Sequence, residues 1–371
     1  MKKTLALLLA VAFAVPAFAG NVFSNVETYG EIETIGFTQS VNADQKAVAN
    51  RVLFGTSMDL VEDVRANLTF NYFNGWGGLT GEDVNTYLDT IEVAEANVVV
   101  SNVFDALEVK VGRQFYGNED SPVMYLGPKH NRYNLLGNVD SLDAALATYS
   151  NDSLAFSAMY GQLANNSDWR VTGLTLDYAF TNNLNAGIYW YDKNVANEHK
   201  GVWGGKAAYQ NEEAKLAVEY AKNYDNGVFS HNNRGWMLKA DAAMNLDVEA
   251  MALTPRITYF HTEKDFQARG NYHPGLVLTY GIANSMVPGN DFRILNPGLD
   301  FSFKALEKVT FAFDYMAVKT DNNWYGNEFD LVATYQHNDY VSFNLGGGVA
   351  THIANDVKDI YVGQMGMTIK F

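Results

Sequence analysis

The chain has 371 residues, with 42 acidic against 26 basic side chains, a formal net charge of -16 and no cysteine. The missing cysteines exclude disulfides and thiol chemistry, and the acidic balance argues against nucleic acid as a partner. Its 22 Tyr, 22 Phe, 6 Trp and 31 Gly against 7 Pro are typical of an exported β protein with one polar and one apolar side.

Residues 1–19 have the features of a secretory signal peptide. Two lysines precede an apolar run over residues 5–15, which is too short to span a membrane as a helix. Pro16 ends the run, and a small-x-small pattern leads up to Ala19. We therefore expect cleavage after Ala19 and a single β-barrel domain over residues 20–371, with no transmembrane helix in it.

From about residue 26 onward, short segments alternate apolar and polar residues and are separated by turns. The clearest pair covers 51–60 and 65–72, joined by a turn that contains Glu62 and Asp63. A period of two places the apolar residues on one face of a strand, so this pair predicts a β-hairpin with opposed surfaces. The pattern recurs at 174–180, 184–190, 216–220, 236–242, 299–303 and 309–315.

Two features favour a membrane barrel over a soluble β-sandwich. The apolar faces often begin or end in an aromatic residue, and short turns alternate with long connections such as 116–141 and 262–293. We predict an all-β fold, a transmembrane antiparallel β-barrel of about 18 strands. The count must be even because both termini should lie on the periplasmic rim. We therefore assign residues 275–281 to the long connection 262–293 rather than to a spanning strand.

The segment 107–116 reads Leu-Glu-Val-Lys-Val-Gly-Arg-Gln-Phe-Tyr. Its core, Val111-Gly112-Arg113-Gln114, resembles the alginate-export porin family. Leu126-Gly127-Pro128 and His273-Pro274-Gly275-Leu276 are similar to parts of the same family. The resemblance implies an outer-membrane barrel, eighteen-stranded and monomeric, with a polar lumen that infolded loops narrow.

Strict alternation gives Arg113 the same phase as Leu107, Val109 and Val111, which face lipid. An arginine on the lipid face costs about 2–4 kcal/mol at the midplane and about 0–1 kcal/mol near the rim. Arg113 therefore lies at the rim, or a bulge at Gly112 turns it inward. We expect the inward placement, because glycine tolerates the backbone of a bulge.

The working residues of a pore are charged side chains that point into its water-filled lumen. By strand phase and by the resemblance, the candidates on strands are Arg65, Lys110, Arg113, Lys239 and Arg256. The loop 116–141 adds Lys129, Arg132 and Tyr133. This loop either narrows the pore or is an exposed outer loop. Inward carboxylates such as Glu219 and Asp241 leave the preference for anions open.

The last strand has apolar residues at Met365, Met367, Ile369 and Phe371. This alternation resembles the terminal strand that the barrel-assembly machinery recognises. The expected partners are outer-membrane lipid, this machinery, and a small hydrophilic solute or polysaccharide.

The expected function is therefore a pore in the bacterial outer membrane. A structural major surface protein with an incidental pore is the alternative. A barrel enzyme is a third class, but most of the seven histidines fall in expected loops and none sits in a nucleophile motif. His261-Thr262-Glu263 is too sparse for a metal site. We expect no catalytic residue, no metal and no cofactor.

Overall fold

The computed structural model describes residues 24–371 apart from 42, 77–89, 131–134, 165, 196–197, 226–234, 264–265, 279–290, 321–322 and 354–357. The expected signal peptide, residues 1–19, lies outside the described residues. In the described part of the chain, no helix is long and apolar enough to cross a membrane.

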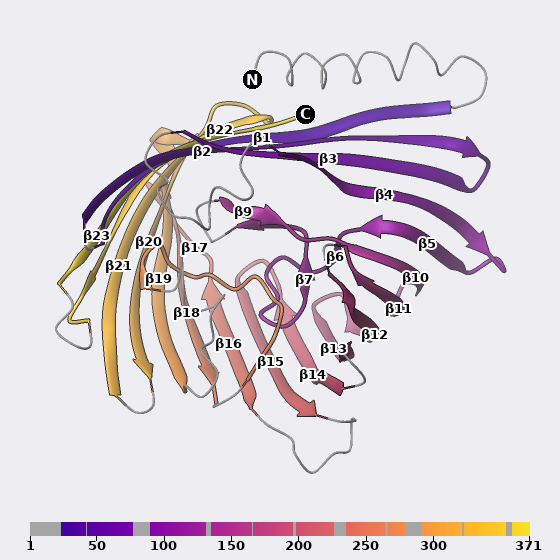
Figure 1. Cartoon of the computed structure of the whole chain (residues 1–371). Coiled ribbons are helices and arrows are strands. Elements are labelled where there is room, and N and C mark those ends of the chain that lie inside the picture. The colour runs from indigo at the N-terminus through magenta and orange to yellow at the C-terminus, as the bar shows by residue number, and fades with distance from the viewer. Residues whose placement is uncertain are drawn as a thin grey trace.

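The chain forms one closed antiparallel barrel (Figure 1). Its sheet has 19 strands, but β17 continues β16 along the same partner, β18. The barrel wall therefore has eighteen positions, each filled by one strand or by β16 with β17, and we call these positions staves. The first and last strands pair with each other and close the sheet. This confirms the predicted barrel and its even number of staves.

The first half of the wall consists of β1 (Ser24–Val41), β2 (Ala43–Val61), β3 (Val64–Trp76), β4 (Thr90–Val103), β5 (Leu107–Gln114), β10 (Leu142–Ser150), β11 (Leu154–Leu163), β12 (Asn166–Thr181) and β13 (Leu184–Val195). The second half consists of β14 (Glu198–Gln210), β15 (Ala214–Asp225), β16 (Trp236–Met244) with β17 (Leu246–Val248), β18 (Met251–Thr262), β19 (Phe292–Phe303), β20 (Val309–Thr320), β21 (Asn323–Gln336), β22 (Val341–Thr351) and β23 (Ile360–Lys370). A short 3-10 helix, η1 (Lys304–Leu306), follows β19.

The alternation in the sequence decides which side of each strand faces outward. Large apolar side chains such as Val111, Leu345 and Met365 are 53%, 65% and 62% exposed on the outer surface, where a bilayer would cover them. Residues of the opposite phase point into the barrel, and many of them are buried there.

The last strand fits the predicted phase. The amide of Gly30 donates to the carbonyl of Phe371 at 2.8 Å, and the amide of Phe371 donates back at 3.1 Å. The Phe371 ring lies 6.3 Å from the ring of Phe54 on β2. At the other end of the first hairpin, β1 and β2 continue as paired strands up to Val41 and Ala43.

Two long loops fold into the barrel. Loop L3 (residues 115–141) contains β6 (Tyr116–Gly117), β7 (Tyr125–Leu126), β8 (Pro128–His130) and β9 (Leu135–Val139), which Figure 1 shows inside the ring of staves. Loop L7 (residues 263–291) includes the described part of 275–281, and residues 275–278 are not in a strand. This agrees with their assignment to the loop.

L3 and L7 are joined to each other by their backbones. The amide of Arg269 donates to the carbonyl of Val123 at 2.9 Å, and the amide of Tyr125 donates to the carbonyl of Arg269 at 2.8 Å. The amide of Asn271 donates to the carbonyl of Ser121 at 2.9 Å. We call these joined loops the partition.

Candidate functional site in the barrel lumen

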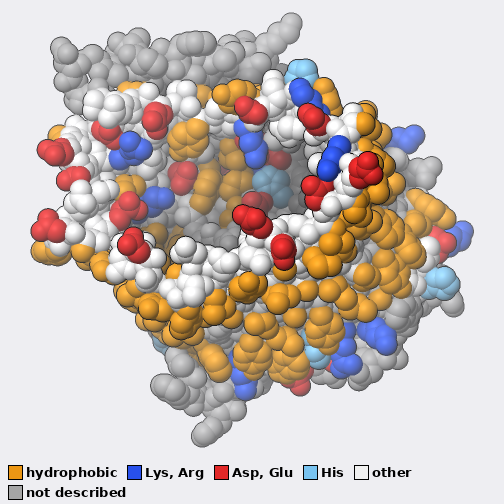
Figure 2. Space-filling model, turned by 180° about the vertical axis from the view of Figure 1, so that it is seen from behind, with side chains coloured by type: hydrophobic (Ala, Val, Ile, Leu, Met, Phe, Trp, Pro, Cys, Tyr) orange, Lys and Arg blue, Asp and Glu red, His pale blue; other side chains and the backbone are white. Residues whose placement is uncertain are grey.

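The partition and the wall enclose a cavity of about 1090 Å³. Figure 2 shows the hollow, with charged side chains around its opening and apolar side chains over the neighbouring outer surface. The wall from β12 to β18 contributes Asp177, Lys206, Lys215, Glu219, Lys239, Asp241 and Arg256. The opposite side, from β1, β23 and L3, contributes Glu31, Glu33, Glu119, Asp120, His130 and Lys370.

Opposite charges alternate across the wall of this cavity. Lys206, Glu219 and Lys239 are direct register partners on β14, β15 and β16. Lys206 also reaches Asp177 two strands away, with 2.9 Å between Nζ and Oδ1. The strand between them carries Gly187 at this level, where a Cβ would lie 2.1 Å from Asp177 Oδ1. Glycine is therefore required for this ion pair.

Arg256 on β18 has a similar arrangement, with a glycine between it and a carboxylate two strands away. Its Nη1 lies 2.6 Å from Asp314 Oδ1 and its Nε lies 3.1 Å from Asp300 Oδ2. Gly298 lies between Arg256 and Asp314 in the register, and a Cβ there would lie 2.4 Å from Nη1. The positive charge of Arg256 is thus neutralised by two carboxylates.

Tyrosines complete the cavity lining. The rings of Tyr189 and Tyr191 stack at 5.6 Å, and Tyr116 of L3 meets Tyr191 edge-on at 6.1 Å. The hydroxyl of Tyr189 donates to Glu219 Oε1 at 2.8 Å. A surface of paired charges and tyrosine rings offers many hydrogen-bond donors and acceptors, together with flat faces for stacking.

The predicted pore residues fall into different places. Lys239 and Arg256 line the cavity, whereas Arg65 and Lys110 are not among the residues that line it. Arg65 lies beside the β2–β3 turn and pairs with Asp59 at 2.8 Å. Lys129 of L3 pairs with Asp140 at 2.9 Å. The last two candidates, Arg132 and Tyr133, lie outside the described residues.

The inward placement expected for Arg113 is wrong. Gly112 has a φ of +123°, yet the pairing runs through it without a register shift on either side. Arg113 therefore keeps the phase of Val111 and does not line the cavity. It forms a bidentate pair with Asp143 on β10, at 2.8 Å and 3.0 Å. This is the rim alternative, with the charge neutralised in place.

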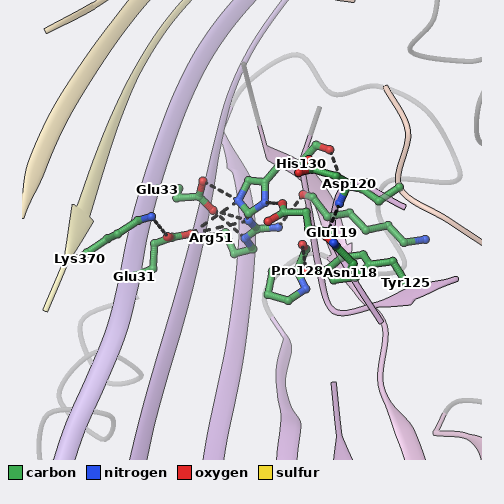
Figure 3. Close-up of polar contacts among 12 residues, drawn as sticks. Glu31, Glu33, Arg51, Asn118, Glu119, Asp120, Tyr125, Pro128, His130 and Lys370 are labelled. Carbon is green, nitrogen blue, oxygen red and sulfur yellow. Dashed lines mark hydrogen bonds and ion pairs between the residues drawn. The ribbon is translucent and has the colours of Figure 1, made fainter. Parts of the chain in front are cut away.

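L3 is held to the wall by Arg51, a residue that the sequence-based candidates did not include (Figure 3). Arg51 is fully buried, and its Nε donates to Glu33 Oε2 at 2.8 Å. Its Nη1 donates to the carbonyl of Lys129 at 3.0 Å. One guanidinium therefore links β2, β1 and L3.

His130 of β8 adds charge to the same contact. Its Nε2 lies 3.0 Å from Glu33 Oε1, and its Nδ1 contacts Glu119. Burial and the charge of Arg51 would lower the pKa of His130, but hydrogen bonds to Glu119, Glu31 and Glu33 outweigh them and raise the pKa to about 10. The raised pKa favours the imidazolium form, which can donate to the carboxylates on both sides.

Glu31, Glu33 and His130 form a group of described residues whose ligand atoms lie within 4.8 Å of one another, as a metal site requires. The Nη2 of Arg51, however, lies 2.5 Å from Glu33 Oε2 and also contacts His130 Nε2. The guanidinium already supplies a cation where a metal ion would bind. We therefore interpret the group as an ionic anchor for L3.

The fold is similar to those of solved outer-membrane barrels. OccK5 (OpdH) of Pseudomonas aeruginosa has 16% identity over 93% of this chain and 98% of its own, with a TM-score of 0.60. OccAB4 of Acinetobacter baumannii has 10% identity, coverage of 95% and 99%, and a TM-score of 0.62. The outer membrane protein OprD of Pseudomonas aeruginosa has 13% identity, coverage of 93% for both chains, and a TM-score of 0.59.

At these identities the likeness establishes the fold alone. It shows a closed β-barrel fold of the kind these proteins have and does not single out the alginate-export family. No protein-family model and no curated protein matches the chain.

Proposed function

We propose that the protein is a porin of the bacterial outer membrane that passes small hydrophilic solutes. One observation carries the proposal: a closed barrel with apolar side chains on its outer wall encloses a cavity lined by charged and tyrosine side chains. Such a wall suits lipid outside and water inside. A channel needs no reacting group, and we infer a channel rather than an enzyme.

The proposal includes export directed by residues 1–19 and assembly through the strand that ends at Phe371. Residues 1–19 would direct secretion, and cleavage would leave residues 20–371 as the barrel. The strand that ends at Phe371 would be the one presented to the barrel-assembly machinery. Its alternation and its pairing with β1 are compatible with that role.

Within the class of small hydrophilic solutes, we propose hydroxyl-rich molecules such as small sugars. The cavity residues Lys206, Lys239 and Arg256 each have a carboxylate partner, so the wall is not a continuous positive track. Paired charges and tyrosine rings can hydrogen-bond and stack with sugars without attracting one sign of ion. Uronate polymers such as alginate remain the second candidate, and the experiment below distinguishes the two.

Planar-bilayer recordings test the proposal. The purified barrel should give open channels with an anion-to-cation permeability ratio within about threefold of unity, because fixed charges set ion selectivity and here they are paired. Neutral oligosaccharides should interrupt the current more than uronates do. Strong anion selectivity with block by uronates would favour the alginate candidate. An absence of conductance from correctly folded protein would contradict the pore itself.

A further inference from the structure

We propose that Glu328 and Asp330 of β21 form a latch that positions L7 across the lumen and so sets the width of the pore. This inference rests on the proposed pore function and adds the residues that hold the constriction in place. Both are positioning residues, since they would act through L7 rather than on the solute.

Both carboxyl groups point into the barrel. Glu328 and Asp330 are 0% and 1% exposed, whereas Phe329 and Leu331 between and after them are 41% and 53% exposed on the outer surface. The register partners of Glu328 are the apolar Met316 and Ala350. The neighbouring strands therefore place no cation directly opposite Glu328, and its oxygens need other hydrogen-bond donors.

L7 supplies those donors from its backbone. The amides of Leu276 and Val277 donate to Glu328 Oε1 at 2.6 Å each, and the amide of Leu278 donates to Oε2 at 2.6 Å. Leu276 also donates to Asp330 Oδ2 at 3.1 Å. Consecutive amides that converge on one carboxylate form an anion-binding nest, here with the anion on the wall and the nest on the loop.

The fit of L7 against β21 depends on Gly275. A Cβ on Gly275 would lie 2.2 Å from Met316 Cε and 2.5 Å from Glu328 Oε1. The next side chains, Leu276 and Leu278, are 5% and 6% exposed. The loop is therefore closely packed around the three amides, and no side chain fits at position 275 without a shift of the neighbouring atoms.

The latch is connected to the constriction through the chain just before it. Asn271, Tyr272, His273 and Pro274 of L7 line the cavity. The Nδ2 of Asn271 donates to the carbonyl of His130 at 2.8 Å, so this segment also contacts L3. Releasing residues 276–278 from β21 would remove the support of the partition on that side.

Glu328→Leu tests the latch because it keeps a buried side chain of comparable size and removes both acceptor oxygens. We expect the single-channel conductance to rise by at least about twofold, with flicker between levels, since an unanchored loop samples open positions. Asp241→Asn is the matched control. It also removes a lumen carboxylate, but Asp241 contacts Lys239 and Thr258 rather than L7. This control should change ion selectivity without flicker.

A disulfide lock provides the converse experiment, because the chain has no cysteine of its own. A Cβ on Gly326 of β21 would lie 3.2 Å from Leu278 Cδ1. Adding Gly326→Cys and Leu278→Cys to Glu328→Leu should restore the steady wild-type conductance when oxidised and the flicker when reduced. Flicker that persists in the oxidised protein would overturn the latch.

Leu276→Pro covers the case in which Glu328→Leu does not assemble. It removes the Leu276 N–H, which donates to both Glu328 and Asp330, and leaves the residues of the barrel wall unchanged. The expected change has the same direction but is smaller, because two of the three amides on Glu328 remain. If either folded latch variant gives the same current traces as the wild type, the latch is overturned and the pore function is not. If the folded wild-type protein gives no current, the pore function itself is overturned.

Discussion

The two ends of the partition are held in different ways. The L3 end is fixed to β1 and β2 by side-chain charges, with Arg51 and His130 among three glutamates. The L7 end is fixed to β21 by backbone amides that donate to Glu328. In the first anchor both partners are side chains, so either charge can be replaced. In the second the acceptor is the Glu328 side chain and the donors are backbone amides, whose positions depend on the path of L7. The first anchor should therefore respond to the loss of either charge, and the second to the loss of Glu328 or of the fit of L7.

The largest expected effect is on the charged end. Arg51→Met would leave Glu33 without its buried partner, and breaking a buried ion pair costs about 3–5 kcal/mol. We expect the free energy of unfolding to fall by that amount, measured by urea titration of the folded barrel in detergent. Arg65→Met is the control, because Arg65 is 44% exposed and the loss of a solvent-exposed ion pair should lower the free energy of unfolding far less. Equal losses in the two variants would contradict the charged anchor.

The contact of L7 with β21 should be lost when a larger side chain is placed at Gly275. Gly275→Val would drive a side chain into Met316 and Glu328, and overpacking typically costs about 1–3 kcal/mol. The loop is expected to leave its position, so conductance should rise in bilayer recordings. Gly36→Ala is the matched control, since its nearest contact would be at an ordinary 3.7 Å. A Gly275→Val channel identical to the control would show that the fit of L7 does not set the pore.

The contact of L3 with β1 and β2 should contribute less to stability as the pH rises. The folded pKa of His130, about 10, lies above its ordinary value of 6.5. The stabilisation is thus complete below about pH 6.5, declines as the pH rises and is lost above about pH 10. The groups that face the ring are Glu31 and Glu33 of β1, Arg51 of β2 and Glu119 of L3.

The measurement compares wild type with His130→Gln in urea titrations between pH 6.5 and pH 10. The difference between the unfolding free energies of the wild type and the His130→Gln variant should fall toward zero as the pH rises. A difference that stays constant over this range would mean that the charge of His130 does not hold L3.

The smallest effect concerns the cavity wall between the two anchors. Lys239→Gln removes one member of the alternating row and leaves Asp241 without its 3.3 Å partner. We expect the reversal potential in a tenfold KCl gradient to shift toward cation selectivity by about 10 mV, because one lumen charge changes and salt screens it. Lys110→Gln should shift it less, as Lys110 does not line the cavity. A larger shift of the reversal potential for Lys110→Gln than for Lys239→Gln would argue against this cavity as the region that sets ion selectivity.

Sequence periodicity was sufficient for the barrel. Alternation along segments such as 51–60 shows which side of a strand faces outward. The parity of the rims requires an even number of strands, and leaving 275–281 out of the wall gives eighteen. Alternation alone also gives the correct side for Arg113. The bulge expected at Gly112 was wrong, because the positive φ of Gly112 changes the backbone locally without changing the register.

The anchors of the loops were beyond sequence reasoning because each depends on a contact between distant segments. Arg51 and His130 are 79 positions apart, and Glu328 meets Leu276 across 52 positions. The available signal was the presence of charged residues in the inward phase of β1, β2 and β21. It does not tell whether such a charge faces water or holds a loop. Only the fold of L3 and L7 decides that.

Liposome swelling with solutes of graded size tests the central claim most directly, since it asks whether this barrel is a pore narrowed by its two loops. Liposomes that contain the wild-type protein should admit monosaccharides readily and larger oligosaccharides slowly. The Glu328→Leu and Gly275→Val channels should admit the larger solutes as well. Wild-type liposomes that stay impermeable to monosaccharides, with the barrel shown to be folded and inserted, would contradict the account.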